Sequence, residues 1–363
     1  MNIEKLHLRD FRNYESADFE FCPTINVIWG ENGRGKTNVL ESVYMLSGSR
    51  SWRGAKTEEL IGWDKQAAFI QALVFNRGRD FRFDIRLASG QKAKITVNDV
   101  PVRKKQAMSE VIKCVLFSPE DLLMIKGGAA NRRSLMDECL CQKYPFYSAA
   151  LSGYELILKN KQRLLRDSED YRILPELNMQ LATYGADIIV YRSRLIVELE
   201  QYAQAIHSEI SGGKESLNLC YKTMLDEYAG LERADLAKNL YQAFCSKEAA
   251  ETASKSCLIG VHRDDIEVYI NTRDARKFAS QGQARTAAIA LKFAEREILQ
   301  ENGDYPLLLL DDVLSELDEP RQKFILKSTQ KGQTIITCCV KPTIFDSENI
   351  RFMNIPQEFI SKK

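Results

Sequence analysis

Apolar and polar positions alternate over much of the first 100 residues. The segment FRFDIRL at 81–87 places an apolar residue at every second position, which predicts a half-buried strand. Residues 93–97 repeat the pattern after the turn-like SGQ, and residues 3–8 form a similar strand that ends in RDFRNY. INVIW at 25–29 predicts a buried strand and 38–47 a helix, while NRGRD and VNDV are typical of hairpin turns.

From about residue 118 the apolar spacing changes to three or four, which predicts helices. The longest such pattern covers residues 177–206 and is far shorter than an extended coiled-coil arm, so we interpret it as one helix of a helical lobe. SGGKES at 211–216 ends it, and more helical sequence follows to about residue 250. Strand character returns in SCLIGVHRDDIEVYI, followed by a helix at 284–299, a buried strand at 307–310, another helix and the strand QTIITCC.

This order predicts an α/β fold that opens, is interrupted by helices, and resumes. We expect a discontinuous lobe of residues 1–117 plus 256–363 and an inserted helical lobe of residues 118–255. The 363 residues are enough for two such lobes.

Composition excludes several classes of protein. The 51 basic and 50 acidic residues nearly cancel, so net charge does not predict a nucleic-acid partner. Nine cysteines without a C-x-x-C pair, and only three histidines, lack the spacing of a zinc site and indicate free thiols in a reducing cytoplasm. No apolar run approaches the ~18 residues of a membrane span, and MNIEKLHLRDF is too charged for a secretory leader, so we expect a cytoplasmic protein.

The strongest motif lies between the strand at 25–29 and the helix that follows it. GENGRGKT matches the P-loop pattern G-x-x-x-x-G-K-[ST], in which backbone N–H groups and a helix N-terminus cradle phosphates. Lys36 would neutralise the β and γ oxygens of a triphosphate, and the Thr37 hydroxyl would be a ligand of Mg²⁺. The predicted ATP-binding residues here are Gly30, Glu31, Asn32, Gly33, Arg34, Gly35, Lys36 and Thr37.

A P-loop ATPase is expected to have, in addition to the P-loop, a buried strand that ends in acidic residues, and LLLLDD supplies it. Asp311 would hold Mg²⁺, and Asp312 would polarise the attacking water, which makes Asp312 and Lys36 the predicted catalytic residues. By itself, an apolar run before two acids is also typical of any strand that ends at a solvated edge. Some 275 residues separate the two motifs, whereas simple kinases and GTPases have them much closer.

A second anion-binding corner is predicted just before the acidic strand. Ser280, Gln281, Gly282 and Gln283 lead into a helix, and a small polar residue with glycine at a helix start is suited to bind an anion. Because one γ-phosphate does not need two such corners, we expect a symmetric dimer in which this corner closes on the partner's ATP, with residues 315–318 crossing the interface. The plain alternative is a capped helix without this role.

Several segments in order resemble the ABC-type ATPases of the SMC class, and most closely the RecF family. They are LHLRDFRNY, GENGRGKTNVLESVY, SRSWR, VLFSPEDL, RRSLMD, GVHRDD, SQGQARTAAIALKFAE and LLLLDDVLSELDEPRQ, and only residues 140–255 match loosely. The resemblance implies an ABC-type ATPase head, with mixed β-sheets around a P-loop core, and an inserted α-helical lobe. It also implies an ATP-dependent dimer that binds duplex DNA near single-strand gaps and acts with RecR and RecO to load RecA during recombinational repair.

The resemblance also implies roles for single residues. Arg12 and Asn13 resemble a phosphate-sensing turn at the ATP site, and Glu120 lies where the family couples nucleotide to the helical lobe. Asp312 occupies a position where many ABC proteins have glutamate, and the shorter side chain implies slow turnover. A polar switch residue is expected after the acidic strand, but ITCCVKP offers only Thr337 and Cys338, so none is assigned.

DNA binding would need phosphate contacts from local basic clusters. Two candidate clusters comprise Arg50, Arg53 and Lys56 beside Trp52, and Lys92, Lys94, Arg103, Lys104 and Lys105. Arg132 and Arg133 are a third candidate. The plain alternative for all of them is a solvated strand face or turn, and we find no motif that reads base sequence.

Two other functions remain open at this point. A small-molecule kinase with a helical lid would be a monomer and would not use the serine-glycine corner. The ATPase subunit of a membrane transporter is disfavoured by the polar N-terminal hairpins and by GVHRDD.

Overall fold

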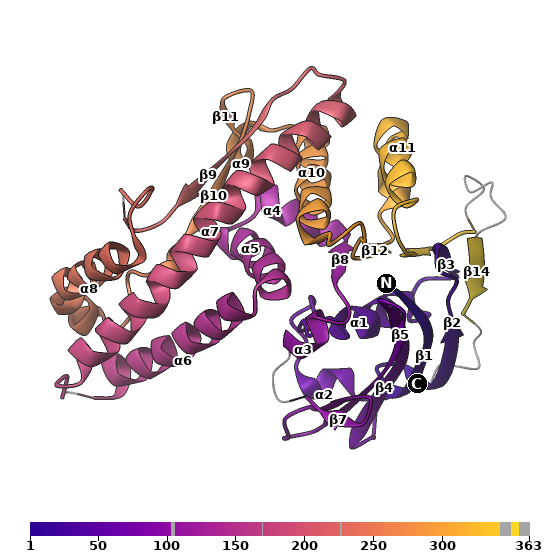
Figure 1. Ribbon diagram of the computed structural model, residues 1–363, viewed down its shortest axis with the longest axis horizontal. Coiled ribbons are helices and arrows are strands. Elements are labelled where there is room, and N and C mark those ends of the chain that lie inside the picture. Colours follow the sequence, from indigo (N-terminus) through magenta and orange to yellow (C-terminus); the bar gives the residue numbers. More distant parts are fainter. Residues whose placement is uncertain (103–105, 169, 226, 342–349, 356–363) are drawn as a thin grey trace. The chain divides into compact units, whose positions relative to one another are not determined.

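The computed structural model describes residues 1–102, 106–168, 170–225, 227–341 and 350–355 (Figure 1). The chain divides into two compact units, one formed by Met1–Asp121 with Glu295–Lys363 and one by Leu122–Ala294. We call them the discontinuous unit and the inserted unit. The sequence placed the boundaries after residues 117 and 255, whereas the units divide after residues 121 and 294. Residues 256–294 group with the inserted unit, because the strand at 265–270 pairs inside it.

The discontinuous unit contains a six-stranded antiparallel sheet in the order β2-β1-β4-β5-β6-β7. Its strands are β1 (Asn2–Phe11), β2 (Tyr14–Glu20), β4 (Ala67–Asn76), β5 (Arg79–Ala88), β6 (Lys94–Val97) and β7 (Val100–Pro101). The predicted alternation is confirmed, because Leu6 and Leu8 of β1 and Phe83 and Ile85 of β5 are buried. Both predicted hairpin turns are confirmed between β4 and β5 and between β6 and β7.

The second sheet of this unit has the order β14-β3-β13-β12-β8, and every neighbouring pair is parallel. Its strands are β3 (Ile25–Trp29), β8 (Cys114–Phe117), β12 (Leu307–Asp311), β13 (Thr334–Cys338) and β14 (Ile350–Asn354), of which β8 and β14 were not predicted. Helix α1 (Lys36–Met45) starts two residues earlier than expected and contributes Val39 and Val43 to the core shared with the antiparallel sheet. Parallel strands end at one edge, so the carboxyl ends of β3, β12 and β13 come together.

The inserted unit is built on four helices, α5 (Ala129–Lys143), α6 (Pro145–Asp167), α7 (Leu174–Ser211) and α8 (Arg233–Ser254). Helix α7 is the long predicted helix and contacts both α6 and α8 (Figure 1). It ends where the sequence indicated, because Gly212 adopts a left-handed backbone with φ of 63°.

The expectation that the sequence after SGGKES is helical up to about residue 250 is wrong in part. Strand β9 (Leu217–Lys222) precedes α8 and pairs antiparallel with β10 (Asp265–Ile270), which pairs in turn with β11 (Arg273–Asp274). Leu217, Leu219 and Tyr221 are buried on one face of β9, and this short alternation was the signal that the helical interpretation missed.

The remaining elements are six further α-helices and three 3₁₀ helices among the described residues. They are α2 (Thr57–Leu60), α3 (Gln106–Ser109), α4 (Leu123–Lys126), α9 (Ala275–Phe278), α10 (Gln281–Leu299), α11 (Glu319–Ser328) and the 3₁₀ helices η1 (Pro119–Leu122), η2 (Val261–Arg263) and η3 (Leu314–Glu316). All nine cysteines are free thiols, as predicted. Among the helices that the structure describes, none is long and apolar enough to cross a membrane.

Candidate nucleotide-binding site

The glycine-rich loop runs from the end of β3 to the first residue of α1. Gly33 and Gly35 have φ of 81° and 87°, a left-handed backbone that favours glycine. A side chain at Gly35 would lie 2.7 Å from Asn13 Oδ1 and 2.9 Å from the Tyr14 hydroxyl, so only glycine fits there. Lys36 then starts α1, and its buried Nζ donates to the carbonyls of Gly30 at 2.7 Å and Glu31 at 3.0 Å. The loop therefore has the strand–loop–helix context of a phosphate-binding P-loop.

Asp311 ends β12 directly beside this loop. The Thr37 hydroxyl donates to Asp311 Oδ1 at 2.9 Å, and the Thr337 hydroxyl of β13 donates to the same oxygen at 2.7 Å. Burial raises the pKa of the Asp311 carboxyl, and the two hydroxyls partly oppose that shift. A hydroxyl and a carboxylate at this position are oxygen ligands of the kind that Mg²⁺ prefers, so the residues present fit the ion.

Asp312 follows in a strained conformation with φ of 53°. Its backbone N–H donates to Thr337 Oγ1 at 3.1 Å, and its carboxylate Oδ2 lies 3.3 Å from the Cys339 thiol. The same thiol lies 2.9 Å from Asn32 Oδ1 of the glycine loop. The sequence considered Thr337 and Cys338 here but missed Cys339, which is the residue that touches both the loop and the second acid.

The two residues predicted to bind ATP in the turn between β1 and β2 contact different parts of the structure. Asn13 lies against the P-loop, where its Oδ1 accepts from Asn38 Nδ2 at 2.8 Å. Arg12 instead pairs with the fully buried Glu41 through two bonds of 2.7 and 2.8 Å, and a third N–H donates to the carbonyl of Glu59. The guanidinium of Arg12 is thus directed at Glu41 in this structure.

The predicted second corner lies in the inserted unit, at the start of α10. Ser280 Oγ accepts from the Gln283 backbone N–H at 3.2 Å, and Gln283 Oε1 accepts from the Ser280 N–H at 2.9 Å. These reciprocal bonds form a capping box and confirm that Ser280, Gln281, Gly282 and Gln283 begin a helix. Ser280 and Gln281 are exposed.

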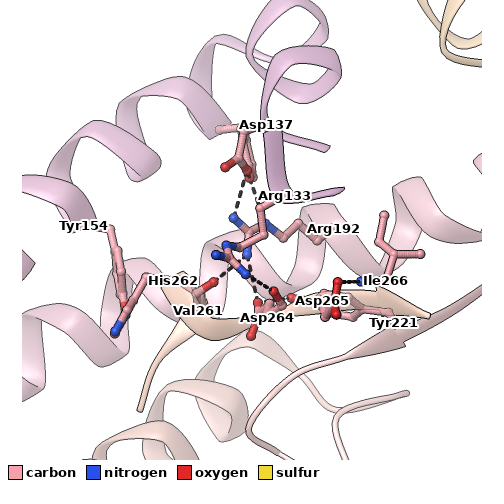
Figure 2. A network of polar contacts seen from close by, with 11 residues as sticks. Arg133, Asp137, Tyr154, Arg192, Tyr221, Val261, His262, Asp264, Asp265 and Ile266 are labelled. Carbon is pink, nitrogen blue, oxygen red and sulfur yellow. Dashed lines mark hydrogen bonds and ion pairs between the residues drawn. The ribbon is translucent and has the colours of Figure 1, made fainter. Parts of the chain in front are cut away.

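The GVHRDD segment forms part of a buried polar network (Figure 2). Arg192 of α7 donates to Asp264 Oδ2 at 2.9 Å, to Asp137 Oδ1 at 2.9 Å and to the Val261 carbonyl at 2.8 Å. Tyr221 of β9 also donates to Asp264. The network connects helices α5 and α7 and strand β9 of the inserted unit to one loop, which gives this segment a structural role.

The basic clusters have mixed surroundings. Five of the candidate side chains are exposed, namely Arg50, Arg53, Lys56, Lys92 and Lys94. Arg103, Lys104 and Lys105 lie outside the described residues.

The third candidate for DNA binding is wrong for Arg132, which is 4% exposed. It makes a two-bond ion pair with Asp265 and donates to the carbonyls of Met124 and Gly127. Arg133 is partly buried and donates to the Asp264 carbonyl at 2.6 Å.

Comparison with known proteins decides the family. Residues 2–360 match the model of the RecF/RecN/SMC N-terminal domain. The chain is 40% identical over 341 residues to a DNA replication and repair protein RecF from Clostridium botulinum strain Loch Maree, with 93% of this chain and 92% of the relative covered. It belongs to the RecF family.

Other RecF-family members agree. A RecF from Lachnospira eligens is 38% identical over 347 residues, covering 93% of this chain and 92% of the relative. The solved structure of the recombination mediator protein RecF-ATPrS in the RecFOR pathway superposes with a TM-score of 0.89 at 32% identity, covering 96% of this chain and 97% of that one.

An SMC head bound to the C-terminal winged-helix domain of ScpA has a TM-score of 0.52 at 15% identity, covering 94% of this chain and 90% of that one, and shares the fold alone. The predicted fold class is confirmed, and this RecF-family chain is an ABC-type ATPase.

Proposed function

We propose that this chain is a DNA-binding protein of recombinational repair and replication restart, in which ATP closes two copies on DNA and slow hydrolysis reopens them. The observation that carries the proposal is the 2.9 Å contact between Thr37 and Asp311, two residues 274 positions apart. A P-loop and an acidic strand that meet after so long an insertion are typical of head ATPases, and the same insertion carries the capped corner at Ser280. Solved RecF relatives described as RecF-ATP and RecF-ATPrS support ATP as the nucleotide.

The proposed division of labour follows the chemistry of each side chain. The amides of residues 30–37 and the Lys36 ammonium bind the phosphates, with Asn13 and Arg12 at the neighbouring turn. Thr37 and Asp311 would hold Mg²⁺, which supplies charge neutralisation between the β and γ phosphates. Asp312 accepts a proton from the attacking water, and Ser280 to Gln283 of the second copy cap the γ-phosphate.

The proposed partners are DNA, RecO and RecR. Relatives described as recombination mediators in the RecFOR pathway support them. We propose that the exposed side chains Arg50, Arg53, Lys56, Lys92 and Lys94 contact the phosphates of duplex DNA beside a single-strand gap, and that this contact stimulates a weak ATPase. The discontinuous unit is proposed as the core of the ATPase, and the protein is proposed to act at the nucleoid.

The experiment is sedimentation of the full chain with Mg²⁺ and ADP, ATP or a non-hydrolysable analogue, with and without gapped duplex. We expect monomers with ADP and dimers with ATP. Ser280→Arg should keep ATP binding but lose the dimer and the DNA-stimulated hydrolysis, whereas Lys36→Met should lose every effect of ATP. Asp312→Asn should form dimers that do not dissociate. A wild-type chain that binds ATP and stays monomeric with gapped DNA would contradict the proposal.

A further inference from the structure

The side-chain amide of Gln283 is held at both of its ends. Its oxygen accepts from the Ser280 N–H at 2.9 Å, which belongs to the capping box of α10. Its nitrogen donates to Glu215 Oε1 at 2.8 Å, a residue 68 positions earlier in the chain. The capping box is complete without this second contact, so α10 does not need Glu215 in order to begin.

Glu215 is itself fixed from two directions. It lies between the end of α7 and the start of β9, and its Oε2 is 3.2 Å from Nε2 of His207, which is fully buried in α7. The next residue, Ser216, exchanges bonds with Asn271 in the turn between β10 and β11, with distances of 2.9 and 3.0 Å. Because Glu215 contacts the buried His207 and the following Ser216 is bonded to Asn271, the carboxylate of Glu215 has a defined position.

Packing alone does not hold Gln283 in place. A hollow of about 310 Å³ lies beside it, lined by Ile270, Asn271, Arg273, Phe278, Ala279 and Gln283. Phe278 on this hollow is 67% exposed. Gln283 therefore has room to adopt other rotamers, and the contact with Glu215 selects one of them.

We propose that Glu215 is a positioning residue for the ATP-capping corner formed by Ser280 to Gln283. By holding the amide of Gln283, it keeps the Ser280 hydroxyl and the first N–H groups of α10 in the orientation that the partner's γ-phosphate requires. This inference rests on the proposed function, because that function assigns the corner its role.

The test uses a swap of the two partners in the full-length chain. Glu215→Ala removes the acceptor and should weaken ATP-driven dimerisation roughly tenfold. Gln283→Glu places two carboxylates in contact and should weaken it at least as much. The double variant Glu215→Gln with Gln283→Glu restores an amide–carboxylate pair in reverse order, and the new carboxylate still suits a capping box, so dimerisation should recover. A merely structural role would not give this recovery.

The chain offers a matched control at the other end of α7. Like Glu215, Glu176 accepts from a glutamine amide, Gln180 Nε2 at 2.9 Å, although Glu176 is exposed and Glu215 is partly buried. Roughly 45 Å of helix separates Glu176 from His207. Glu176→Ala should leave dimerisation within twofold of wild type. Thermal unfolding checks that every variant is folded, and Gln283→Glu, which removes the donor of the same hydrogen bond, serves if Glu215→Ala does not fold.

A second measurement separates this inference from the proposed function. Hydrogen exchange of the peptide covering residues 279–286, without nucleotide, should be faster in Glu215→Ala and should return to wild type in the double variant. If wild type fails to dimerise, the proposed function falls, and exchange still decides whether Glu215 orients the corner. Exchange and dimerisation in Glu215→Ala that match Glu176→Ala, or a double variant that recovers neither, overturn the inference.

Discussion

At the scale of single residues, Gly33 and Gly35 have similar backbone angles in different surroundings. Both are left-handed, with φ of 81° and 87°. A side chain at Gly33 would meet nothing within 4 Å, whereas one at Gly35 would press against Asn13 and Tyr14. The pair therefore separates the cost of backbone strain from the cost of crowding in one loop.

Alanine at these two positions should have different effects on stability. Gly33→Ala should lower the free energy of unfolding by about 1 kcal/mol, the usual penalty of a left-handed alanine. Gly35→Ala should cost about 2 kcal/mol more, because Asn13 is held by Asn38 and cannot withdraw freely. Urea unfolding of both variants measures the difference. Equal losses would mean that the loop opens without resistance at Gly35.

Cys339 is the residue that the structure adds to the candidate site. Burial, followed by the contact with Asp312, raises the pKa of its thiol above the ordinary value of 9.0, so near neutral pH it remains a hydrogen-bond donor. It can donate to Asp312 or to Asn32, which connects the proposed catalytic acid to the phosphate loop.

Substitution of Cys339 should affect hydrolysis more than binding. Cys339→Ala removes the donor and should lower the rate of ATP hydrolysis roughly three- to tenfold, the range of one modest hydrogen bond. Cys339→Ser keeps a donor and should stay near wild type. Single-turnover hydrolysis and ATP titration of both variants provide the check, and equal rates in the alanine and serine variants would remove Cys339 from the mechanism.

At the scale of elements, the loop that contains η2 is held in part by buried polar groups. His262 contacts the Tyr154 hydroxyl through Nδ1 at 2.9 Å, while its buried Nε2 has no hydrogen-bond partner among the residues that the structure describes. Burial, aided by Arg263, lowers the pKa of His262 from 6.5 to about 4. Asp264, in the same loop, has its pKa raised by burial to about 6.

These shifts predict a pH dependence that His262 and Asp264 drive in opposite directions. The stabilisation by neutral His262 is present above pH 6.5 and is lost as the pH falls from 6.5 through about 4, because only the unfolded chain takes up the proton. The contribution of Asp264 is present below its unfolded pKa of 3.8 and is lost as the pH rises through about 6. Comparison with His262→Asn, whose amide can still reach Tyr154, isolates the histidine.

The advantage of wild type over His262→Asn should therefore shrink by about 2 kcal/mol between pH 7.5 and pH 5. Urea unfolding at the two pH values measures it. Stability curves that run parallel for the two proteins across this range would show that His262 is protonated alike in the folded and unfolded states.

At the scale of the whole molecule, one compact unit is assembled from the two ends of the chain. The P-loop comes from the first part, Asp311 and Thr337 come from the last part, and the inserted unit lies between them in sequence. Because both parts contribute to one site, a ligand bound there should stabilise the discontinuous unit as a whole.

Mg²⁺ and ATP should raise the stability of the full chain by about 2.7 kcal/mol at a hundredfold excess over the dissociation constant. Lys36→Met should abolish this gain. Ser280→Arg should keep the gain in stability at low protein concentration, because that gain comes from ATP binding to a single chain. It should lose any further gain at high protein concentration, because that further gain requires a dimer. Thermal unfolding at two protein concentrations measures both parts, and an unchanged gain in Lys36→Met would place the nucleotide elsewhere.

The sequence alone determined the parts of this protein whose signals are local. The P-loop, the alternating strands, the long helix and the cap at Ser280 each depend on residues within a few positions of one another, and the structure contains all of them. Period and turn chemistry are sufficient for such elements. Asp311 could also be singled out, because its apolar strand with an acidic end follows a P-loop in the same chain.

Contacts between distant residues could be established only from the folded chain. The pairing of β9 with β10, the contact of Cys339 with Asp312, the turn of Arg12 toward Glu41 and the contact of Glu215 with Gln283 all join segments far apart in the chain. A side chain's partners depend on packing and burial, and neither can be predicted from the local sequence pattern. The buried position of Arg132 has the same cause: a doublet of arginines looks solvated in sequence, but Asp265 and two carbonyls fix one of them inside the fold.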